Sequence, residues 1–336
     1  MTKVAINGFG RIGRAFFRMA AKSVDIEIVA INDLASPDNL VYLLKYDSVY
    51  GKYPEEVEER GGALVVGGRE IKILCEKDPT KLPWGTLGVD VVVESTGVFE
   101  TYEKARAHLT GGAKKVVITA PAKDEAPDAA TVLMGVNDDK LKTCVITSNA
   151  SCTTNAASPV LAILHEALGI EKAILNTVHA YTASQSIVDS AAKGDFRRGR
   201  AAAVNISPSS TGAAIATTKA ITDLAGKFDG IAIRVPVPAG SLVDITFISK
   251  RETSPEDVNM ILKNAAKTER WKGLFAVTDE PLVSSDIVGS TVAALADLSF
   301  TRVVDGNLVK VLAWYDNEMG YAATLVAHVI KAGQSL

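Results

Sequence analysis

The sequence predicts a two-domain protein in which a doubly wound parallel α/β domain is followed by an α+β domain with a mixed or antiparallel sheet. The chain has 336 residues, enough for about two domains of ordinary size. Over residues 1–150, short runs rich in valine and isoleucine alternate with helical patterns, as expected of parallel strands buried on both faces. Beyond residue 151 the strand-like runs are longer and the helices fewer, which favours a mixed or antiparallel sheet.

Composition excludes several other classes of protein. Hydrophobic residues make up 47% of the chain and charged residues 22%, close to the globular average, so a disordered or collagen-like chain is excluded. The formal net charge is -3, whereas nucleic-acid binders are usually basic. Nucleic acid is therefore not expected as the main partner. Cys75, Cys144 and Cys152 are too few and too scattered for a disulfide framework or a zinc site, so no metal is expected.

The chain shows no sign of a leader or a membrane span. The amino terminus, MTKVAINGFG, lacks a basic segment followed by a long apolar one. Polar residues interrupt every apolar run before it reaches about 18 residues. With so few cysteines a reducing compartment is the simpler expectation, and we expect a soluble, cytoplasmic protein without a membrane partner.

The first domain, expected over residues 1–150, begins with a strand–turn–helix–strand unit. Lys3–Asn7 is a short apolar run that stops at glycines, Ile12–Ala21 has apolar residues at helical spacing, and Ile26–Ile31 is a second buried strand. Further strands are expected at Lys72–Leu74, Val89–Glu94, Lys115–Thr119 and Val145–Ser148, with a helical segment at Glu103–Leu109. This alternation predicts parallel strands joined by helices.

The turn after the first strand carries a glycine motif. Gly8, Gly10 and Gly13 match G-x-G-x-x-G after a strand and at the start of a helix, where glycines allow the backbone to approach a pyrophosphate on the helix N-terminus. Asp33 follows at the end of the second strand, where a carboxylate binds ribose hydroxyls and repels a 2′-phosphate. The plain alternative is a glycine-rich turn with a capping aspartate. The combined context predicts an NAD-binding Rossmann domain.

The second domain is expected over residues 151–316, and residues 317–336 are expected to form a C-terminal helix that packs back on the NAD-binding domain. A helix with an apolar stripe is predicted from about Thr153 to Leu168, and Pro159 either begins its regular part or kinks it. Strands are predicted at Ala173–His179, Gly230–Val237, Leu242–Lys250 and Leu308–Trp314, and a last helix at Gly320–Ala332.

Cys152 lies where a strand leads into the first helix of this domain. Backbone N–H groups at a helix N-terminus favour a thiolate, but a thiol of ordinary pKa, about 8.5, is only slightly ionised at neutral pH and needs a base. The alternative is a buried core thiol, which is the default for cysteine and is kept for Cys75 and Cys144, both within apolar strands.

Histidine is the usual base for such a cysteine, and the chain has four histidines. His179 ends a strand-like run and is followed by polar residues, as a site residue would be. His108 and His165 are interpreted as helix-surface residues. His179 is therefore the candidate base.

Six segments together resemble the phosphorylating glyceraldehyde-3-phosphate dehydrogenases. NGFGRIGR, SNASCTTN, VHAYT, SPSSTGAA, RVPVP and WYDNEMGY occur in family order from Asn7 to Tyr321, so the resemblance covers essentially the whole chain. It implies NAD-dependent oxidation and phosphorylation of D-glyceraldehyde 3-phosphate to 1,3-bisphosphoglycerate, a step of glycolysis and gluconeogenesis. It also implies a homotetramer in which the segment around Asp189–Pro208 meets a neighbour's cofactor site.

The resemblance also implies the roles of the reacting residues. Cys152 attacks the aldehyde to give a hemithioacetal, and His179 takes the hydroxyl proton as hydride passes to the nicotinamide, leaving a thioester that inorganic phosphate attacks. Family positions for the substrate's phosphate are Thr182 and Arg234. Those for the attacking phosphate are Ser151, Thr153, Thr211, Gly212 and an arginine of FRRGR, for which Arg197 is favoured and Arg198 and Arg200 stay open.

Ten positions match the family's NAD contacts. They are Gly8, Gly10, Arg11, Ile12, Gly13, Asp33, Lys77, Thr96, Thr119 and Asn317. Asn317 is implied to hold the nicotinamide carboxamide. Ser184 and Ala191 depart from residues frequent in NAD-specific relatives, which leaves the strictness of cofactor choice open, but Asp33 still favours NAD over NADP.

Three other functions compete with this one. An erythrose-4-phosphate dehydrogenase usually alters the VHAYT and STG segments, and both are intact here. A cysteine hydrolase built on Cys152 and His179 is disfavoured by the dinucleotide half. An NAD-binding or RNA-binding regulator without catalysis is disfavoured by the intact cysteine and histidine.

Overall fold

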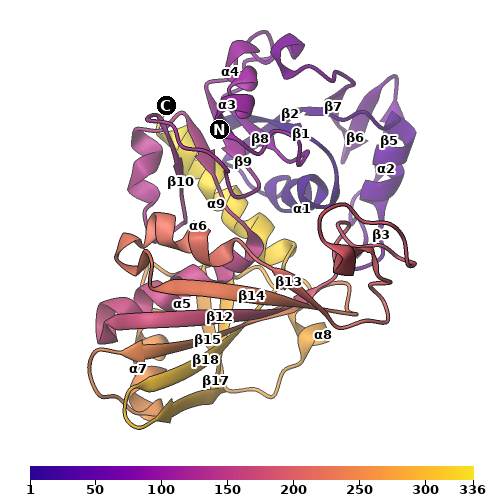
Figure 1. Ribbon diagram of the computed structural model, residues 1–336. Coiled ribbons are helices and arrows are strands. Elements are labelled where there is room, and N and C mark those ends of the chain that lie inside the picture. The colour runs from indigo at the N-terminus through magenta and orange to yellow at the C-terminus, as the bar shows by residue number, and fades with distance from the viewer. The chain divides into compact units, whose positions relative to one another are not determined.

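The computed structural model describes residues 1–336, which divide into two compact units (Figure 1). The first unit comprises Met1–Ala150 and Ala322–Leu336, and the second comprises Ser151–Tyr321. The division falls inside the C-terminal helix α9 (Met319–Gln334), five residues beyond the expected boundary at 316/317. The first turn of α9 therefore belongs with the second unit and the rest with the first.

The first unit is built on one nine-stranded sheet in the order β10-β11-β9-β8-β1-β2-β7-β6-β5. The strands are β1 (Thr2–Asn7), β2 (Ile26–Asn32), β5 (Val57–Arg60), β6 (Ala63–Val66), β7 (Arg69–Leu74), β8 (Val91–Glu94), β9 (Lys115–Ile118), β10 (Ala129–Thr131) and β11 (Ile146–Ser148). All pairings from β10 to β7 are parallel, and β6 and β5 are added antiparallel. The strand order reverses direction on either side of β1, so the predicted doubly wound fold is confirmed.

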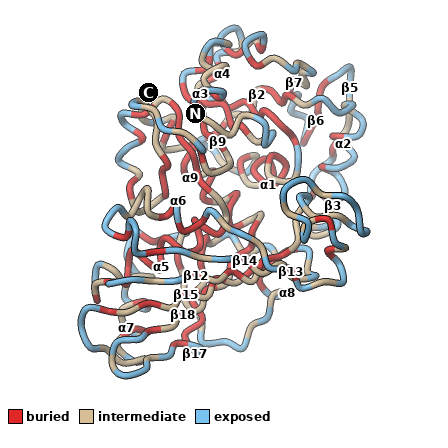
Figure 2. The backbone as a smooth tube through the Cα atoms, in the orientation of Figure 1, coloured by how far each residue is buried: buried red, intermediate tan, exposed pale blue.

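The central strands form because their residues are apolar on both faces. Every residue of β8 (VVVE) and β9 (KVVI) is buried, and the centre of this sheet is the most buried part of the unit (Figure 2). Such strands need cover on both sides. The helices of the unit are α1 (Arg11–Ala20), α2 (Pro37–Lys45), α3 (Tyr102–Ala105) and α4 (Ala107–Thr110), and a small hairpin joins β3 (Tyr46–Asp47) to β4 (Gly51–Lys52).

Three features of this unit differ from the sequence interpretation. The helix α2 and the strands β3, β4, β5, β6 and β10 were not predicted. His108, interpreted as a surface residue, is fully buried and accepts a hydrogen bond from Trp84 Nε1–H, because α4 is a single turn enclosed by its neighbours. Cys75, interpreted as a core thiol, is exposed, since β7 ends one residue before it, whereas Cys144 is buried as expected.

The second unit contains a seven-stranded mixed sheet in the order β13-β14-β12-β15-β18-β17-β16. The strands are β12 (Ile170–Ala180), β13 (Ser207–Ser210), β14 (Phe228–Val235), β15 (Ser241–Ser249), β16 (Phe275–Thr278), β17 (Ala294–Val304) and β18 (Leu308–Tyr315). The pairs β12–β14 and β16–β17 are parallel and the others antiparallel. The predicted mixed sheet is confirmed.

Helices cover one face of this sheet. They are α5 (Cys152–Leu168), α6 (Ala213–Ala220), α7 (Pro255–Ala265) and the single turn α8 (Ser284–Ile287). The helix α5 packs on β15, β17 and β18, and the alternate residues of β15 that face it are buried while their neighbours are half-buried. Pro159 lies within α5, so the helix begins before the proline rather than at it.

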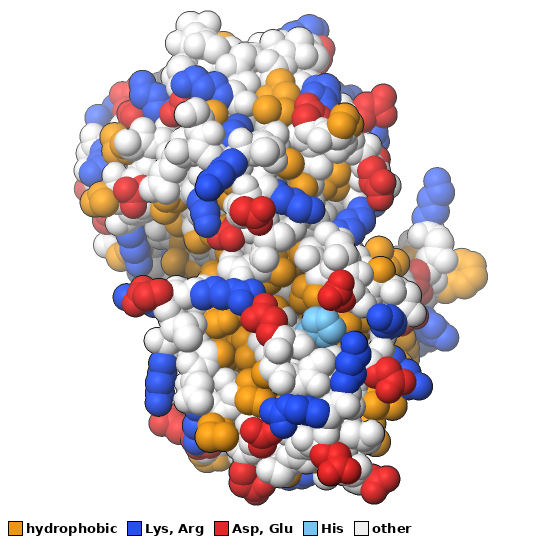
Figure 3. All heavy atoms as spheres, turned by 90° about the vertical axis from the view of Figure 1, so that its left-hand side faces the viewer, with side chains coloured by type: hydrophobic (Ala, Val, Ile, Leu, Met, Phe, Trp, Pro, Cys, Tyr) orange, Lys and Arg blue, Asp and Glu red, His pale blue; other side chains and the backbone are white.

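The surface carries both signs of charge. Lysine and arginine side chains are interspersed with aspartate and glutamate side chains over the face shown in Figure 3. None of the helices combines the length and the apolar character needed to cross a membrane.

His328 of α9 is a buried polar residue in the first unit. Its Nδ1 lies 3.0 Å from Asn149 Oδ1 and its Nε2 lies 2.7 Å from Thr147 Oγ1. Because an amide oxygen only accepts, Nδ1 carries the proton and Nε2 accepts from the threonine hydroxyl. Burial lowers the pKa of His328 to about 3.

Acid should therefore destabilise the protein through His328. Its pKa is about 3 when folded and about 6.5 when unfolded, so the unfolded chain gains a proton that the folded chain cannot. The stability is complete above about pH 6.5 and falls by about 1.4 kcal/mol per pH unit below it. Urea midpoints between pH 7.5 and 4.5 should show a shallower loss for His328→Gln. The half-buried His165 supplies the control, His165→Gln, and an unchanged slope for His328→Gln would contradict this origin.

Candidate active site

The glycine loop of the first unit lines a cavity of about 380 Å³. Gly8, with a φ of +92°, turns the chain from β1 into α1. A Cβ on Gly8 would lie 2.7 Å from the backbone of Ser95 and Thr96, and one on Gly13 would lie 2.2 Å from the Gly8 carbonyl oxygen. Only glycine therefore allows β1, β8 and α1 to approach so closely. The cavity and the exposed N-terminus of α1, capped by Gly10, suit a pyrophosphate.

Asp33 lies against the glycine loop and lines the same cavity. Its Oδ2 accepts a hydrogen bond of 2.7 Å from the Phe9 N–H, and its Oδ1 accepts one of 2.9 Å from the Ala35 N–H. Each carboxylate oxygen keeps a lone pair for a ribose hydroxyl. The arrangement fits the ribose of a dinucleotide and disfavours a 2′-phosphate.

A buried polar cluster adjoins the cavity. Glu94 Oε2 accepts from Asn7 Nδ2 at 2.6 Å and lies 2.8 Å from His108 Nε2. Glu94 Oε1 accepts from the Thr96 N–H at 2.9 Å and from the Thr96 hydroxyl. Asn32 Nδ2 donates to Asn7 Oδ1 at 2.7 Å. Sequence analysis missed this cluster, although polar residues that end neighbouring apolar strands were a usable signal.

The cavity brings together five of the ten expected cofactor positions: Gly8, Gly10, Asp33, Lys77 and Thr96. The remaining positions lie elsewhere. Arg11 forms an ion pair of 2.6 Å with Asp47, Ile12 and Gly13 are part of α1, and the Thr119 N–H donates to the Glu94 carbonyl oxygen at the end of β9. Asn317 belongs to the second unit.

In the second unit Cys152 is paired with His179. Cys152 is the first residue of α5, and Ser151 caps the helix by accepting a hydrogen bond of 3.1 Å from the Thr154 N–H. His179 is near the end of β12. Cys152 Sγ lies 3.3 Å from His179 Nε2, which is hydrogen-bond distance for a thiol and an imidazole nitrogen.

The neighbours of His179 decide which ring nitrogen is the base. His179 Nδ1 lies 2.7 Å from the Ala180 carbonyl oxygen. Two neighbours of Nδ1 imply opposite tautomers, because the carbonyl oxygen only accepts whereas Arg234 Nη1, 2.6 Å from Nδ1, only donates. We assign the proton to Nδ1, because Arg234 Nη1 has the Ala180 carbonyl oxygen as an acceptor and the Nε2 lone pair is then free to accept from the Cys152 thiol. Nε2 is therefore oriented to take the thiol proton.

Arg234 also contacts the Ala180 carbonyl group. It is the register partner of His179 in the parallel pair β12–β14. Arg234 Nη1 donates to the Ala180 carbonyl oxygen at 3.0 Å and lies 2.6 Å from His179 Nδ1. A half-buried guanidinium thus stands directly beside the catalytic pair, where an anion is favoured.

Burial governs the titration of the pair. It raises the pKa of the Cys152 thiol, against the opposing charge of Arg234 and the hydrogen bonds of Thr153. Burial, reinforced by Arg234, lowers the pKa of His179 to about 3. The resting pair is a neutral thiol beside a neutral imidazole, and the expected help from the N–H groups of α5 is smaller than the effect of burial.

The other expected anion positions lie on neighbouring segments of the second unit. Thr153 is buried, and its Oγ1 lies 2.9 Å from Tyr315 Oη. Thr182 follows β12, with its Oγ1 3.0 Å from Ser184 Oγ. Thr211 Oγ1 accepts from the Ala213 N–H at 3.2 Å, and the exposed Gly212 caps α6. Hydroxyls and helix N-termini of this kind suit phosphate oxygens.

The three arginines of FRRGR are placed differently. Arg197 is exposed, and Arg200 forms an exposed ion pair. Arg198 is half-buried, and its Nη2 donates to Ser209 Oγ at 3.2 Å. Ser209 lies on β13, which pairs with the strand β14 that carries Arg234, and the charge of Arg198 adds to burial in lowering the pKa of Arg234. Arg198, rather than the favoured Arg197, is therefore the arginine near the Cys152–His179 pair.

Tyr315 is a site residue that sequence analysis missed. It is buried, its ring meets that of His179 edge to face at 5.9 Å, and its Oη lies 2.8 Å from Thr177 Oγ1. The Thr177 hydroxyl donates to the Leu242 carbonyl oxygen, so Tyr315 donates to Thr177 and accepts from Thr153. This chain of hydroxyls holds the first turn of α5 against the sheet.

A doubly wound sheet with a glycine cradle for a dinucleotide, joined to a unit with a cysteine–histidine pair beside an arginine, defines the class of nicotinamide-dependent oxidoreductases. The comparisons with known proteins agree. Residues 2–102 match the family model described as the glyceraldehyde 3-phosphate dehydrogenase NAD binding domain, and residues 151–317 match the model of the C-terminal domain of the same enzymes.

Relatives are similar over nearly the full length. The glyceraldehyde-3-phosphate dehydrogenase of Geobacillus stearothermophilus is 51% identical over 98% of this chain and 99% of its own length. That of Thermotoga maritima is 52% identical over 97% of both chains, and that of Borreliella burgdorferi is 48% identical over 96% of this chain and 97% of its own. The chain belongs to the glyceraldehyde-3-phosphate dehydrogenase family. NAD as cofactor and the oxidoreductase class are confirmed.

Removal of the Asp33 charge should relax the choice between NAD and NADP. Asp33→Asn keeps an oxygen for the Phe9 N–H but loses the charge that repels a 2′-phosphate, so the ratio of the NADP and NAD dissociation constants should fall by about tenfold. Titration calorimetry with both cofactors measures it. An unchanged ratio would mean that other residues set the preference.

Proposed function

We propose that this chain oxidises and phosphorylates D-glyceraldehyde 3-phosphate with NAD, and that Cys152 and His179 perform the reaction. The activity is the one that the names of the relatives carry. The observation that supports the residue roles is the 3.3 Å contact between Cys152 Sγ and His179 Nε2. The nucleophile and its base are thus within reach of one another.

The proton moves through His179 Nε2. It leaves Cys152 Sγ for Nε2 as sulfur bonds to the aldehyde carbon, and it then passes to the oxygen, giving a hemithioacetal. NAD, when bound, accepts a hydride from that carbon. Nε2 takes the hydroxyl proton back at this step, which leaves a thioester on Cys152. An attacking phosphate oxygen bonds to the thioester carbon, the carbon–sulfur bond breaks, and the thiolate recovers the proton from His179.

Two anion sites are needed for this chemistry. Arg234 with Thr182 is proposed for the phosphate of the substrate. Arg198 is proposed for the attacking phosphate, together with the positions at the N-termini of α5 and α6: Ser151, Thr153, Thr211 and Gly212. A guanidinium fork and hydroxyl donors match phosphate oxygens, and the closeness of Arg198 to Arg234 supports a pair of neighbouring anion sites.

NAD is proposed to bind through residues of both units. The glycine loop, Asp33, Lys77 and Thr96 are proposed for the adenosine and pyrophosphate, and Arg11, Ile12 and Thr119 for supporting contacts around them. Asn317 of the second unit is proposed for the nicotinamide carboxamide. The cavity of the first unit and the close approach permitted by Gly8 support the first part of this assignment.

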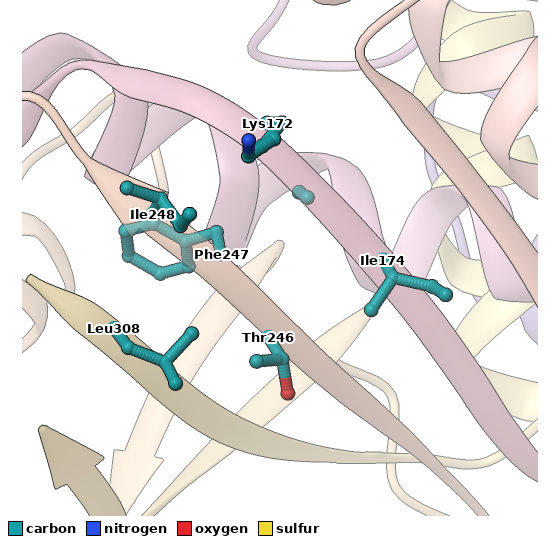
Figure 4. Close-up of a pocket in the computed structure, with 7 residues that line it drawn as sticks. Lys172, Ile174, Thr246, Phe247, Ile248 and Leu308 are labelled. Atoms are coloured by element: carbon teal, nitrogen blue, oxygen red, sulfur yellow. The ribbon is translucent and has the colours of Figure 1, made fainter. Parts of the chain in front are cut away.

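A homotetramer is proposed for the assembly. The uncovered face of the sheet in the second unit has a hollow of about 260 Å³ lined by residues such as Ile174, Thr246, Ile248 and Leu308 (Figure 4). Ile174 is 59% exposed and Leu308 is 41% exposed. Apolar side chains on a sheet face favour burial against another surface, and we propose a second copy of this chain as that surface.

A cytoplasmic location is also proposed, supported by three cysteines that are all free.

The proposed function is tested by the initial rate of NADH formation from glyceraldehyde 3-phosphate with and without inorganic phosphate. We expect strong turnover that depends on phosphate, because phosphate must release the acyl group from Cys152. Cys152→Ser should abolish turnover while NAD binding is kept. Phosphate-independent turnover would instead indicate a hydrolytic dehydrogenase, and greater activity with erythrose 4-phosphate would indicate that substrate.

The choice among the arginines is tested by a pair of variants. Arg198→Ala should raise the KM for inorganic phosphate by more than about tenfold, since a charged hydrogen bond contributes about 1.5–3 kcal/mol. Arg197→Ala should leave it within about twofold, because the side chain is exposed. The reverse result would return the site to Arg197. Unchanged NAD binding in both variants serves as the control for folding.

A further inference from the structure

Ser241, the first residue of β15, links two parts of the catalytic unit. The residue is 1% exposed. Its Oγ accepts a hydrogen bond of 3.1 Å from the Ala180 N–H and donates one of 3.0 Å to Asn317 Oδ1. Ala180 also holds the ring of His179 through its carbonyl oxygen. One buried hydroxyl therefore joins Ala180, the residue whose carbonyl oxygen orients His179, to the amide of Asn317.

The direction of these two bonds fixes the orientation of the Asn317 amide. The Ala180 N–H can only donate, so the Ser241 hydroxyl accepts from it and must donate its own proton to another group. Asn317 Oδ1 is that acceptor. With the amide turned over, two N–H donors would meet the Ser241 oxygen and its own proton would lack a partner, which is costly for buried groups. Oδ1 therefore faces Ser241, and the Nδ2 donors point elsewhere.

The backbone around Ser241 is held in place. Gly240 has a φ of +84°, and a Cβ there would lie 2.3 Å from the Ser284 carbonyl oxygen. Ser241 is the register partner of Tyr315 at the end of the antiparallel pair β15–β18, and Asn317, two residues further, is 5% exposed. Ser241 and Asn317 are both buried and have little room to move. The Ser241 hydroxyl can therefore hold the Asn317 amide in one orientation.

We propose that Ser241 is a positioning residue that fixes the Asn317 amide so that it distinguishes the nitrogen from the oxygen of the nicotinamide carboxamide. This inference rests on the proposed role of Asn317. A primary carboxamide carries a donor side and an acceptor side, and an amide of fixed orientation is complementary to it in one arrangement only. The Ser241 hydroxyl thereby links recognition of the nicotinamide to Ala180, the residue that orients His179.

The test compares Ser241→Ala with a matched control at the other end of the same strand. Ser249 is buried to a similar extent, and its hydroxyl donates to the Arg251 carbonyl oxygen at 2.7 Å, away from the site residues. Titration calorimetry on the full chain measures dissociation constants for NAD, for ADP-ribose, which lacks the nicotinamide, and for thionicotinamide adenine dinucleotide, in which sulfur, a weak acceptor, replaces the carboxamide oxygen that the Asn317 Nδ2 donor would bind.

Ser241→Ala should weaken NAD binding by about fivefold, the effect of one lost hydrogen bond. ADP-ribose binding should stay within about twofold, and the preference for NAD over the thionicotinamide analogue should shrink. Ser249→Ala should change none of the three, and Ser241→Thr, which keeps the hydroxyl, should retain the preference. An equal loss for NAD and ADP-ribose in Ser241→Ala would overturn the proposal, because it would indicate a general disturbance of the unit.

Asn317→Ala separates this inference from the proposed function. If Asn317→Ala weakens NAD relative to ADP-ribose and Ser241→Ala does not, the role of Ser241 is wrong while that of Asn317 stands. If neither variant alters the ratio, the proposed role of Asn317 fails and the inference fails with it.

Discussion

The parallel pairing of β12 with β14 is the constraint on which the catalytic unit depends. Parallel strands end at the same edge of a sheet, and the register sets His179 opposite Arg234 at that edge. A cationic side chain and a base therefore stand side by side with no contribution from loop geometry. The Ala180 carbonyl oxygen receives both donors, so a single backbone group orients the imidazole and the guanidinium. A shift of one residue in this pairing would turn one of the two side chains to the other face.

The electrostatics of the site follow from this placement. Burial disfavours both charged forms of the pair, the thiolate and the imidazolium, while Arg234 favours the first and disfavours the second. An anion bound to Arg234 would offset its charge and so remove a force that holds His179 neutral. If Arg234 binds the phosphate of the substrate, as proposed above, the substrate's own charge adjusts the basicity of His179.

Much of the fold could be predicted from the sequence because the central strands are apolar on both faces and the glycine motif has a strict context. The strand β8 and the helix α5 were located within two residues. The helix α2 and the strands β5 and β6 were missed, since their short mixed patterns carry no clear period. Cys152 and His179 were proposed from their places at element ends and from family resemblance, and the structure brings their side chains to hydrogen-bond distance. The half-burial of Arg198 and the exposure of Arg197 in FRRGR could not be predicted, because the burial of adjacent residues is decided only when the loop folds.

The three buried histidines of this chain differ in their hydrogen-bond partners, so the sequence alone does not reveal which of them can act as a base. Trp84 Nε1–H donates to His108 Nδ1, so the proton of His108 is on Nε2 and faces the Glu94 carboxylate. The ring of His328 is saturated by Asn149 and Thr147. His179 shares burial with both, and with His328 it shares a strongly lowered pKa. What distinguishes His179 is that a backbone carbonyl takes its Nδ1 proton and leaves the Nε2 lone pair facing a sulfur atom. Burial and a lowered pKa therefore do not distinguish a histidine that can act as a base from a structural one. The distinguishing feature is the atom that faces the ring nitrogen carrying the lone pair, which for His179 is Cys152 Sγ.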